Sequence, residues 1–334
     1  SHGFYEKGRN GKARYLYGGD FGAAYHWSNP SLAGFHTSDG TPKPSWEELG
    51  ALSAVREQMQ YLIDYPAYLD TVHENAAQMA ALAVFSRESS FSRRNIEKTD
   101  RDFPRSVSLS LDNDLALNAF ASDRLCGYSL LVFLLAAVLE FFEERKRGLW
   151  SLIHAADGGR CRLALNRATI LLVLSIGATA VLFGGKLLGL SLRYGGLGDL
   201  SRSIQSLAVF RDVPWVMNAR AYLLLRFLLQ SAGVYLVSLI LWAVLQAVNH
   251  LPLAIAVGSG FLALEYCAFT FIPDSYALVI LRYINIFAVV DTPTVTLHYL
   301  NLDLFGWPVQ GFLLSMGLIL PLTVLTVIIN LVLS

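Results

Sequence analysis

The chain has 334 residues, of which 54% are hydrophobic and 16% are charged, and its mean hydropathy is +0.44. This composition is too apolar for an ordinary water-soluble protein. The 26 basic and 26 acidic residues balance, which gives no bulk attraction to a nucleic acid, so we expect no nucleic-acid partner. Most charges precede Phe120, and the remainder reads as apolar runs of membrane-spanning length. We therefore expect a mostly α-helical, polytopic membrane protein with a polar N-terminal region.

Residues 1–44 are rich in glycine, aromatic and turn-forming residues, which predicts an irregular N-terminal segment with short strands. Within it, residues 17–22 (YGGDFG) and 39–45 (DGTPKPS) resemble the end of the catalytic barrel in family 2 glycoside hydrolases. These stretches hold no pair of catalytic carboxylates, which such chemistry requires. A membrane-anchored enzyme acting on glycans is therefore the last of the three functions that we consider.

Residues 45–123 are predicted to form a helical domain outside the membrane. The Ser-Trp-Glu-Glu sequence at 45–48 is a capping box, in which the serine and a glutamate satisfy free backbone amides at a helix start. Apolar residues then recur at helical spacing over 49–62 and over 69–82, with Pro66 between them. This pattern predicts two long helices, or one kinked helix, in a hairpin. Packing within that hairpin explains the apolar face better than a ligand groove does.

The rest of this domain carries little chemistry. We interpret His73 and Glu74 as a solvated pair, and the alternation over 106–110 predicts a short strand. The sequence contains no phosphate-binding loop, no His-Glu-x-x-His and no Gly-x-Ser-x-Gly, and its three cysteines have no metal-ligand spacing. We therefore expect no enzymatic activity, no metal site and no cofactor in this chain.

Residues 124–334 are predicted to form the transmembrane domain, because several apolar runs in it are long enough to cross the hydrocarbon core as helices. We expect about five spans, at residues 125–142, 168–190, 221–248, 251–272 and 309–333.

The connection at 143–167 is the most distinctive of the loops. It is short and basic, so the positive-inside rule places it in the cytoplasm and residues 1–123 outside. The loop at 191–220 is also basic and would then lie outside, which weakens this assignment. An external N-terminal domain needs a preceding span to carry it across, so we expect that a first span is missing from this chain. After Gly148, apolar residues share one face of a short amphipathic helix, which suits either a cytosolic partner or the bilayer surface.

The same loop resembles a segment of permeases in the type-two ABC exporter superfamily. In that family the pattern Glu-x-x-x-Gly-Thr-Leu-x-x-Leu-x-x-Thr-Pro-x-x-Arg, closed by a lysine, follows the second transmembrane helix. The chain matches at Glu144, Gly148, Leu152, Arg160 and, as a basic substitute, Arg167. It departs from the pattern with Leu149, Ala156 and Asp157 in place of Thr, Thr and Pro. Parts of 65–103 and the segment 281–309 also resemble the external domain and the last external loop of a Firmicutes-type subgroup.

The resemblance implies a specific set of partners. A separate cytosolic ABC ATPase would bind ATP and Mg²⁺, and a second permease half, identical or different, would complete the transporter in the lipid of a bacterial plasma membrane. The coupling helix at about 149–156 would dock on the ATPase. The residues implied in this coupling are Glu144, Gly148, Leu149, Trp150, Leu152, Ile153, Arg160 and Arg167. The exported cargo would be peptide-like or amphipathic.

Ionisable residues within the predicted spans are further candidates, because charge in hydrocarbon is costly. Glu265 and Arg226 are the candidates for a translocation path or gate. For Glu265, a structural hydrogen bond between helices is an equal alternative. For Arg226, snorkelling of the side chain to the interface is the preferred explanation. A non-transporting receptor or scaffold, with an external ligand-binding domain, remains the main alternative to a permease.

Overall fold

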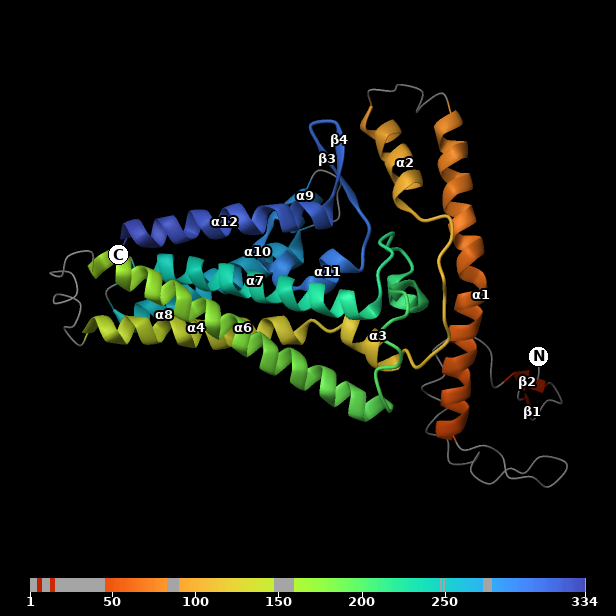
Figure 1. Cartoon of the computed structure of the whole chain (residues 1–334), viewed down its shortest axis with the longest axis horizontal. Helices are drawn as coiled ribbons and strands as arrows, with labels where there is room; N and C mark the ends of the chain where they lie inside the picture. The colour runs from red at the N-terminus through yellow and green to blue at the C-terminus, as the bar shows by residue number, and fades with distance from the viewer. Residues whose placement is uncertain are drawn as a thin grey trace. The chain divides into compact units, whose positions relative to one another are not determined.

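The computed structural model describes residues 5–7, 13–15, 46–82, 90–146, 159–246, 248, 250–272 and 278–333. The chain is mostly helical and divides into two compact units, Ser1–Gln60 and Tyr61–Ser334 (Figure 1). In the first unit, β1 (Tyr5–Lys7) pairs antiparallel with β2 (Ala13–Tyr15), and α1 (Trp46–Ala81) begins. The stretches that resemble a glycoside hydrolase, 17–22 and 39–45, lie outside the described residues.

Helix α1 starts at Trp46, directly after the predicted capping serine, and continues through Pro66. Of the two predicted alternatives, the single helix is therefore correct. Proline removes one backbone hydrogen bond from the helix, but Tyr65 and Leu69 on either side of it are buried in one apolar cluster. This packing holds the turn that Pro66 weakens.

The predicted hairpin of 49–62 and 69–82 does not form, because α1 runs through both stretches; the end of α1 instead contacts a second helix, α2 (Phe91–Asp102). The Ser90 hydroxyl accepts the backbone N–H of Arg93 and caps the start of α2. His73 of α1 pairs with Asp100 of α2, at 2.8 Å between Nδ1 and Oδ1, so the predicted solvated pair with Glu74 is wrong. The error arose because helix spacing cannot show which residues a second helix brings near.

Residues 103–114 form an extended coil rather than the predicted strand at 106–110. The backbone N–H of Ser110 donates to the side-chain oxygen of Ser206, at 3.1 Å. Alternating residues form a strand only when a neighbouring strand completes the ladder. Here a side chain supplies the partner instead. The coil leads into the short helix α3 (Leu115–Ala121).

Apolar helices form the body of the second unit (Figure 1). They are α4 (Leu125–Lys146), α6 (Gly159–Tyr194), α7 (Ala219–Gln246), α8 (Leu251–Phe271) and α12 (Gly311–Leu333). In α6 (from Cys161), α7, α8 and α12 the structure describes four helices long and apolar enough to cross a membrane. This confirms an integral membrane protein of mostly helical structure. The described apolar stretch of α4, Ser129–Glu140, is shorter than a span, and its assignment as a fifth span stays a prediction.

Helix α7 is the inner helix of this bundle. It contacts α4, α6, α8 and α12, and 67% of its apolar window is buried, against 28% or less for the other three spans. The outer helices therefore leave most of their apolar side chains facing outward, as expected for contact with lipid.

The remaining short elements lie in the connections. They are the 3₁₀ turns η4 (Ile204–Ser206) and η5 (Ala208–Phe210), the helices α9 (Val279–Ile284), α10 (Ile286–Val290) and α11 (Thr292–Thr296), and the strands β3 (Asn301–Leu304) and β4 (Trp307–Gln310). The two strands form an antiparallel hairpin in which Asn301 lies opposite Gln310 and Leu304 opposite Trp307. Helix α12 follows at once.

The predicted loop at 143–167 is shorter in the structure. Helix α4 extends to Lys146 and α6 begins at Gly159, nine residues before the predicted span at 168. The hydropathy of 160–167 is low, but its residues are good helix formers and extend the helix beyond the apolar run. At 1.5 Å per residue, α6 is about 54 Å long, more than the hydrocarbon core requires.

Candidate functional site: the junction of the cap and the membrane helices

Several segments of the second unit pack together at the end of the bundle where α4 and α7 begin. We call them the cap: residues 61–82, 90–124, 195–218 and 297–310. The Tyr61 hydroxyl donates to the backbone oxygen of Gln205 at 2.8 Å, and the Tyr68 hydroxyl donates to Asp212 at 2.9 Å. The guanidinium of Arg211 lies 4.4 Å from the centre of the Tyr68 ring. These contacts fasten α1 to the connection between α6 and α7.

The coil after α2 binds the same connection. The Asn113 side chain donates to the backbone oxygen of Tyr194, the last residue of α6, at 2.8 Å. The Arg202 guanidinium donates to the backbone oxygen of Asn113 at 2.7 Å. A shift of this coil therefore moves the end of a membrane helix.

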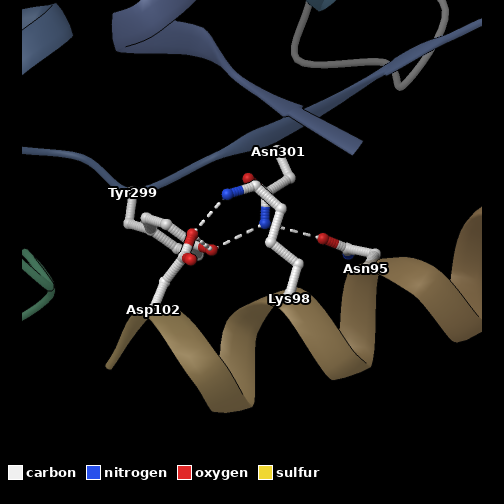
Figure 2. A network of polar contacts seen from close by, with 5 residues as sticks. All are labelled: Asn95, Lys98, Asp102, Tyr299 and Asn301. Atoms are coloured by element: carbon white, nitrogen blue, oxygen red, sulfur yellow. Dashed lines mark hydrogen bonds and ion pairs between the residues drawn. The ribbon is translucent and has the colours of Figure 1, made fainter. Parts of the chain in front are cut away.

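A polar network joins α2 to the segment that leads into α12 (Figure 2). The Tyr299 hydroxyl donates to Asp102 at 2.9 Å, and the Asn301 side-chain nitrogen donates to Asn95 and to the Tyr299 oxygen, each at 2.8 Å. Lys98 forms an ion pair with the same Asp102 carboxylate. We call these five residues the clamp. In Figure 2 the side chains of Asn95, Lys98 and Asp102 point from α2 toward those of Tyr299 and Asn301.

The electrostatics of the cap keep its tyrosines neutral. Burial, together with the negative charge of Asp102, raises the pKa of Tyr299 to about 12. Burial, with Asp212 nearby, raises the pKa of Tyr65 to about 12 as well. The Tyr65 hydroxyl has no hydrogen-bond partner among the described residues. Neutral hydroxyl donors such as Tyr299 thus hold the cap together with charged contacts such as the Lys98–Asp102 ion pair.

Arg226 lies where the cap meets the bundle. Its side chain is 1% exposed, and its guanidinium donates to the backbone oxygens of Phe120 and Asp123. It also lies 4.5 Å from the centre of the Phe120 ring. The predicted snorkelling is therefore wrong, because the charge is buried against carbonyl groups instead of reaching solvent. These bonds satisfy carbonyls at the end of α3 and just after it, before α4 begins.

Further charges surround Arg226. Asp291, between α10 and α11, is fully buried, accepts a hydrogen bond from Thr294 at 2.6 Å, and lies 3.6 Å from the Arg124 guanidinium. Lys186 of α6 pairs with Asp123 at 3.1 Å. We call these five charged residues the junction: Asp123, Arg124, Lys186, Arg226 and Asp291. They connect the α3–α4 joint, α6, α7 and the α10–α11 segment.

Glu265 lies within the last two turns of α8, and the side-chain nitrogen of Asn285 donates to its carboxylate at 3.0 Å. The side-chain oxygen of Asn285 in turn accepts the N–H of Phe287 and caps α10. This is the interhelical hydrogen bond that was one of the two alternatives for Glu265. The structure does not bring Glu265 and Arg226 into one site, and a gating role for either stays a prediction.

Most residues implied in ATPase coupling cannot be placed. Gly148, Leu149, Trp150, Leu152 and Ile153 lie outside the described residues. Glu144 lies in α4 and Arg160 in α6, but their side chains also lie outside the described set. The side chain of Arg167 is 5% exposed and lies on α6 between two core alanines, Ala164 and Ala168.

The sequence reasoning missed most of the junction, although one signal was present. Asp291 is the only acidic residue in the otherwise apolar and hydroxyl-bearing run 286–297. A lone carboxylate in such a run indicates a buried partner of opposite charge. The carbonyl partners of Arg226 gave no such signal, since every residue has a backbone oxygen.

Among the described residues, no group of three or more His, Cys, Asp or Glu side chains is arranged to hold a metal ion. The arrangement instead connects parts of the chain mechanically. No family model, curated protein or solved structure matches this chain.

Proposed function

We propose that this chain is the membrane subunit of an ABC exporter, which moves a peptide-like or amphipathic molecule by using ATP hydrolysis in a separate subunit. The observation that supports this most is that α1, α2 and the coil after α2 bind both long connections of the bundle, through Tyr61, Tyr68 and Asn113 on one side and the clamp on the other. The ends of α6, α7 and α12 therefore follow the position of the cap.

The exporter-like pattern falls between the end of α4 and the start of α6 in the sequence. Helix α4 leaves the junction and ends at Lys146, and α6 begins at Gly159 and returns to the cap. At 1.5 Å per residue, α4 alone separates the loop from the junction by about 33 Å. Rigid helices of this length transmit a displacement at one end to the other. In the proposal, Leu149, Leu152 and Ile153 dock on the ATPase, and its closure moves α4 and α6.

Transport requires the cargo and the nucleotide to bind inward-facing and outward-facing states with different affinity. The junction is suited to distinguish such states, because its buried charges lose their partners if α7 moves relative to the α3–α4 joint. We propose that it holds the cap end of the bundle closed in one state of the cycle. A cargo that pulls the cap away from this end would release it.

A receptor or scaffold that does not transport is the second candidate, and the tight packing around α7 favours it. A small pocket of about 10 Å³, roughly the space for one water molecule, lies between α7, α10, α11 and α12 and is lined by mostly apolar side chains including Leu229, Val289 and Met316. It is smaller than the roughly 300–1,000 Å³ of small-molecule sites. A receptor needs only the cap–bundle connection and no path for cargo.

Affinity purification of the tagged chain from its native membrane separates these functions. The permease proposal predicts that an ATPase co-purifies and that the double variant Leu152→Asp and Ile153→Asp loses it. Leu111→Asp is the matched control, since it makes the same change at an exposed leucine of the cap. Retention of the ATPase by the double variant would contradict the assignment of residues 149–156 as the coupling helix. Absence of any ATPase from the native preparation would favour the receptor.

A further inference from the structure

The tip of the β3–β4 hairpin exposes two large aromatic side chains. Phe305 is 100% exposed and Trp307 is 62% exposed. Phe305 also has a φ of +55°, a left-handed conformation that is uncommon outside glycine, and it is followed by Gly306 at +85°. A phenylalanine in this position strains the backbone and gains no burial within the chain. Both features are explained if the side chain is buried against something outside the protein.

The base of the hairpin is fixed, so the position of the tip is defined. Leu302 is buried in a cluster with Val279 and Tyr283 of α9, and the N–H of Gly311 donates to the backbone oxygen of Leu300 at 2.8 Å. At Gly311 a β-carbon would lie 2.5 Å from the Tyr283 ring, so the start of α12 fits closely against α9.

The hairpin leads directly into α12, one of the four helices long and apolar enough to cross a membrane. Trp307 precedes the first residue of α12 by four positions, about 13 Å of extended chain at most. In Figure 1 the hairpin projects sideways from the first turn of α12, across the axis of that helix. The exposed apolar residues Leu313 of α12 and Leu281 of α9 lie on the neighbouring elements. The aromatic tip thus lies close in the chain to the start of the apolar surface that α12 exposes.

A cation completes the surface. The Arg94 guanidinium of α2 lies 4.1 Å from the centre of the Trp307 ring and donates to the backbone oxygen of Gly306 at 3.0 Å. The nearby acid, Asp303, uses one carboxylate oxygen to accept the N–H of Gly306. Aromatic rings beside an arginine match the glycerol and phosphate layer of a bilayer, where tryptophan is enriched.

We propose that the β3–β4 hairpin is an interfacial anchor, whose Phe305 and Trp307 side chains insert among phospholipid headgroups beside α12. The anchor fixes the start of α12 at the membrane surface. Through Arg94 and the clamp it also fixes α2 of the cap at that depth. This inference depends on the membrane-spanning helices and not on the proposed transport activity.

The test uses the full chain reconstituted in phospholipid vesicles, with the native cysteines replaced by serine and an environment-sensitive fluorophore at Phe305→Cys. We expect a blue-shifted emission, quenching by lipids that carry a nitroxide near the headgroup, and less quenching by iodide than at a water-exposed control position. The control is Ile63→Cys, an exposed apolar position on the face of α1 opposite Tyr61 and Tyr65. At this position we expect iodide quenching and no quenching by lipid.

Two outcomes would overturn the proposal. Iodide quenching at 305 equal to that at 63 would place the tip in water, and protection from both iodide and nitroxide lipid would place it against protein. A measurement without a label guards against a misfolded variant. Brominated lipids should quench a smaller share of the tryptophan fluorescence in Trp307→Phe than in the native chain. The control Trp242→Phe, which changes a buried tryptophan, should not lower this share. An unchanged share in Trp307→Phe contradicts the anchor.

Discussion

Arg226 combines a buried charge with backbone partners far away in the sequence. Its two carbonyl partners precede it by 106 and 103 residues. A buried guanidinium that keeps its hydrogen bonds stabilises the fold, but removing it takes a donor from each of two backbone carbonyls and leaves Arg124 as the partner of the buried Asp291. We therefore expect Arg226 to be the most sensitive single position at the junction.

Replacing Arg226 with methionine should lower the free energy of unfolding by about 3 kcal/mol. Arg226→Lys should fall between this variant and the native chain, because lysine keeps the charge but not the fork that reaches both carbonyls. Thermal unfolding of the purified chain in detergent measures the effect. The control is Arg220→Met, which removes an exposed arginine from the same helix. Equal melting temperatures for the two methionine variants would show that the buried bonds contribute nothing.

Tyr65 provides the pH-dependent prediction. Its pKa is raised to about 12 in the folded chain, above the value of about 10 for an exposed tyrosine. The folded state therefore keeps the proton more tightly than the unfolded state does. The corresponding stability is fully present below about pH 10 and is lost as pH rises from about 10 towards 12.

At pH 8 the free energy of unfolding of the Tyr65→Phe variant should lie within about 1 kcal/mol of that of the native chain, because the buried hydroxyl has no hydrogen-bond partner among the described residues. Between about pH 10 and 12 the variant should lose less stability than the native chain, because phenylalanine does not ionise. Melting temperatures across this range check both statements. An identical alkaline decline in the two proteins contradicts the assignment.

At the scale of elements, the coil before α3 is held to the segment that follows α6 by a close approach of two backbones. Gly198 has a φ of +69°, and a β-carbon there would lie 2.5 Å from the Asn113 oxygen and 2.9 Å from the Asp112 carboxylate. Gly195 has a similar φ of +76° but open space around it. Comparing substitutions at the two glycines therefore separates the cost of a left-handed backbone from the cost of a steric clash.

Gly195→Ala should destabilise the chain by about 1 kcal/mol, the cost of a left-handed alanine. Gly198→Ala should cost a further 1–3 kcal/mol or so, because the coil at 112–113 must move. The difference should also appear as faster amide exchange of residues 110–115 in the Gly198 variant alone. Equal melting temperatures and equal amide-exchange rates for the two alanine variants would show that the contact of Gly198 with residues 112–113 does not stabilise the cap.

The elements themselves were largely predictable. Hydropathy placed the spans observed as α7, α8 and α12 within two residues at each end, because apolar runs in lipid have to be helical. The start of α6 was missed because low hydropathy marks the edge of the membrane and not the end of a helix. The strand predicted at 106–110 does not form, because strand formation depends on a partner that the local sequence does not contain.

At the scale of the whole molecule, the sequence pointed to a loop at one end of the bundle, whereas the structure describes the other end. The cap, the clamp and the junction all depend on pairs of groups far apart in the sequence, such as Asn95 with Asn301. Such pairs have no local pattern. The central claim that joins both ends is that the cap and the 147–158 loop lie on opposite sides of the membrane.

Labelling with a membrane-impermeant thiol reagent in intact cells tests this claim most directly. The chain carries a single cysteine, at Glu97→Cys in the exposed part of α2 or at Ile153→Cys in the loop, with the native cysteines replaced by serine. The account predicts that the reagent labels position 97 in intact cells and position 153 only after the membrane is permeabilised. Labelling of both positions in intact cells, or of position 153 alone, would contradict it.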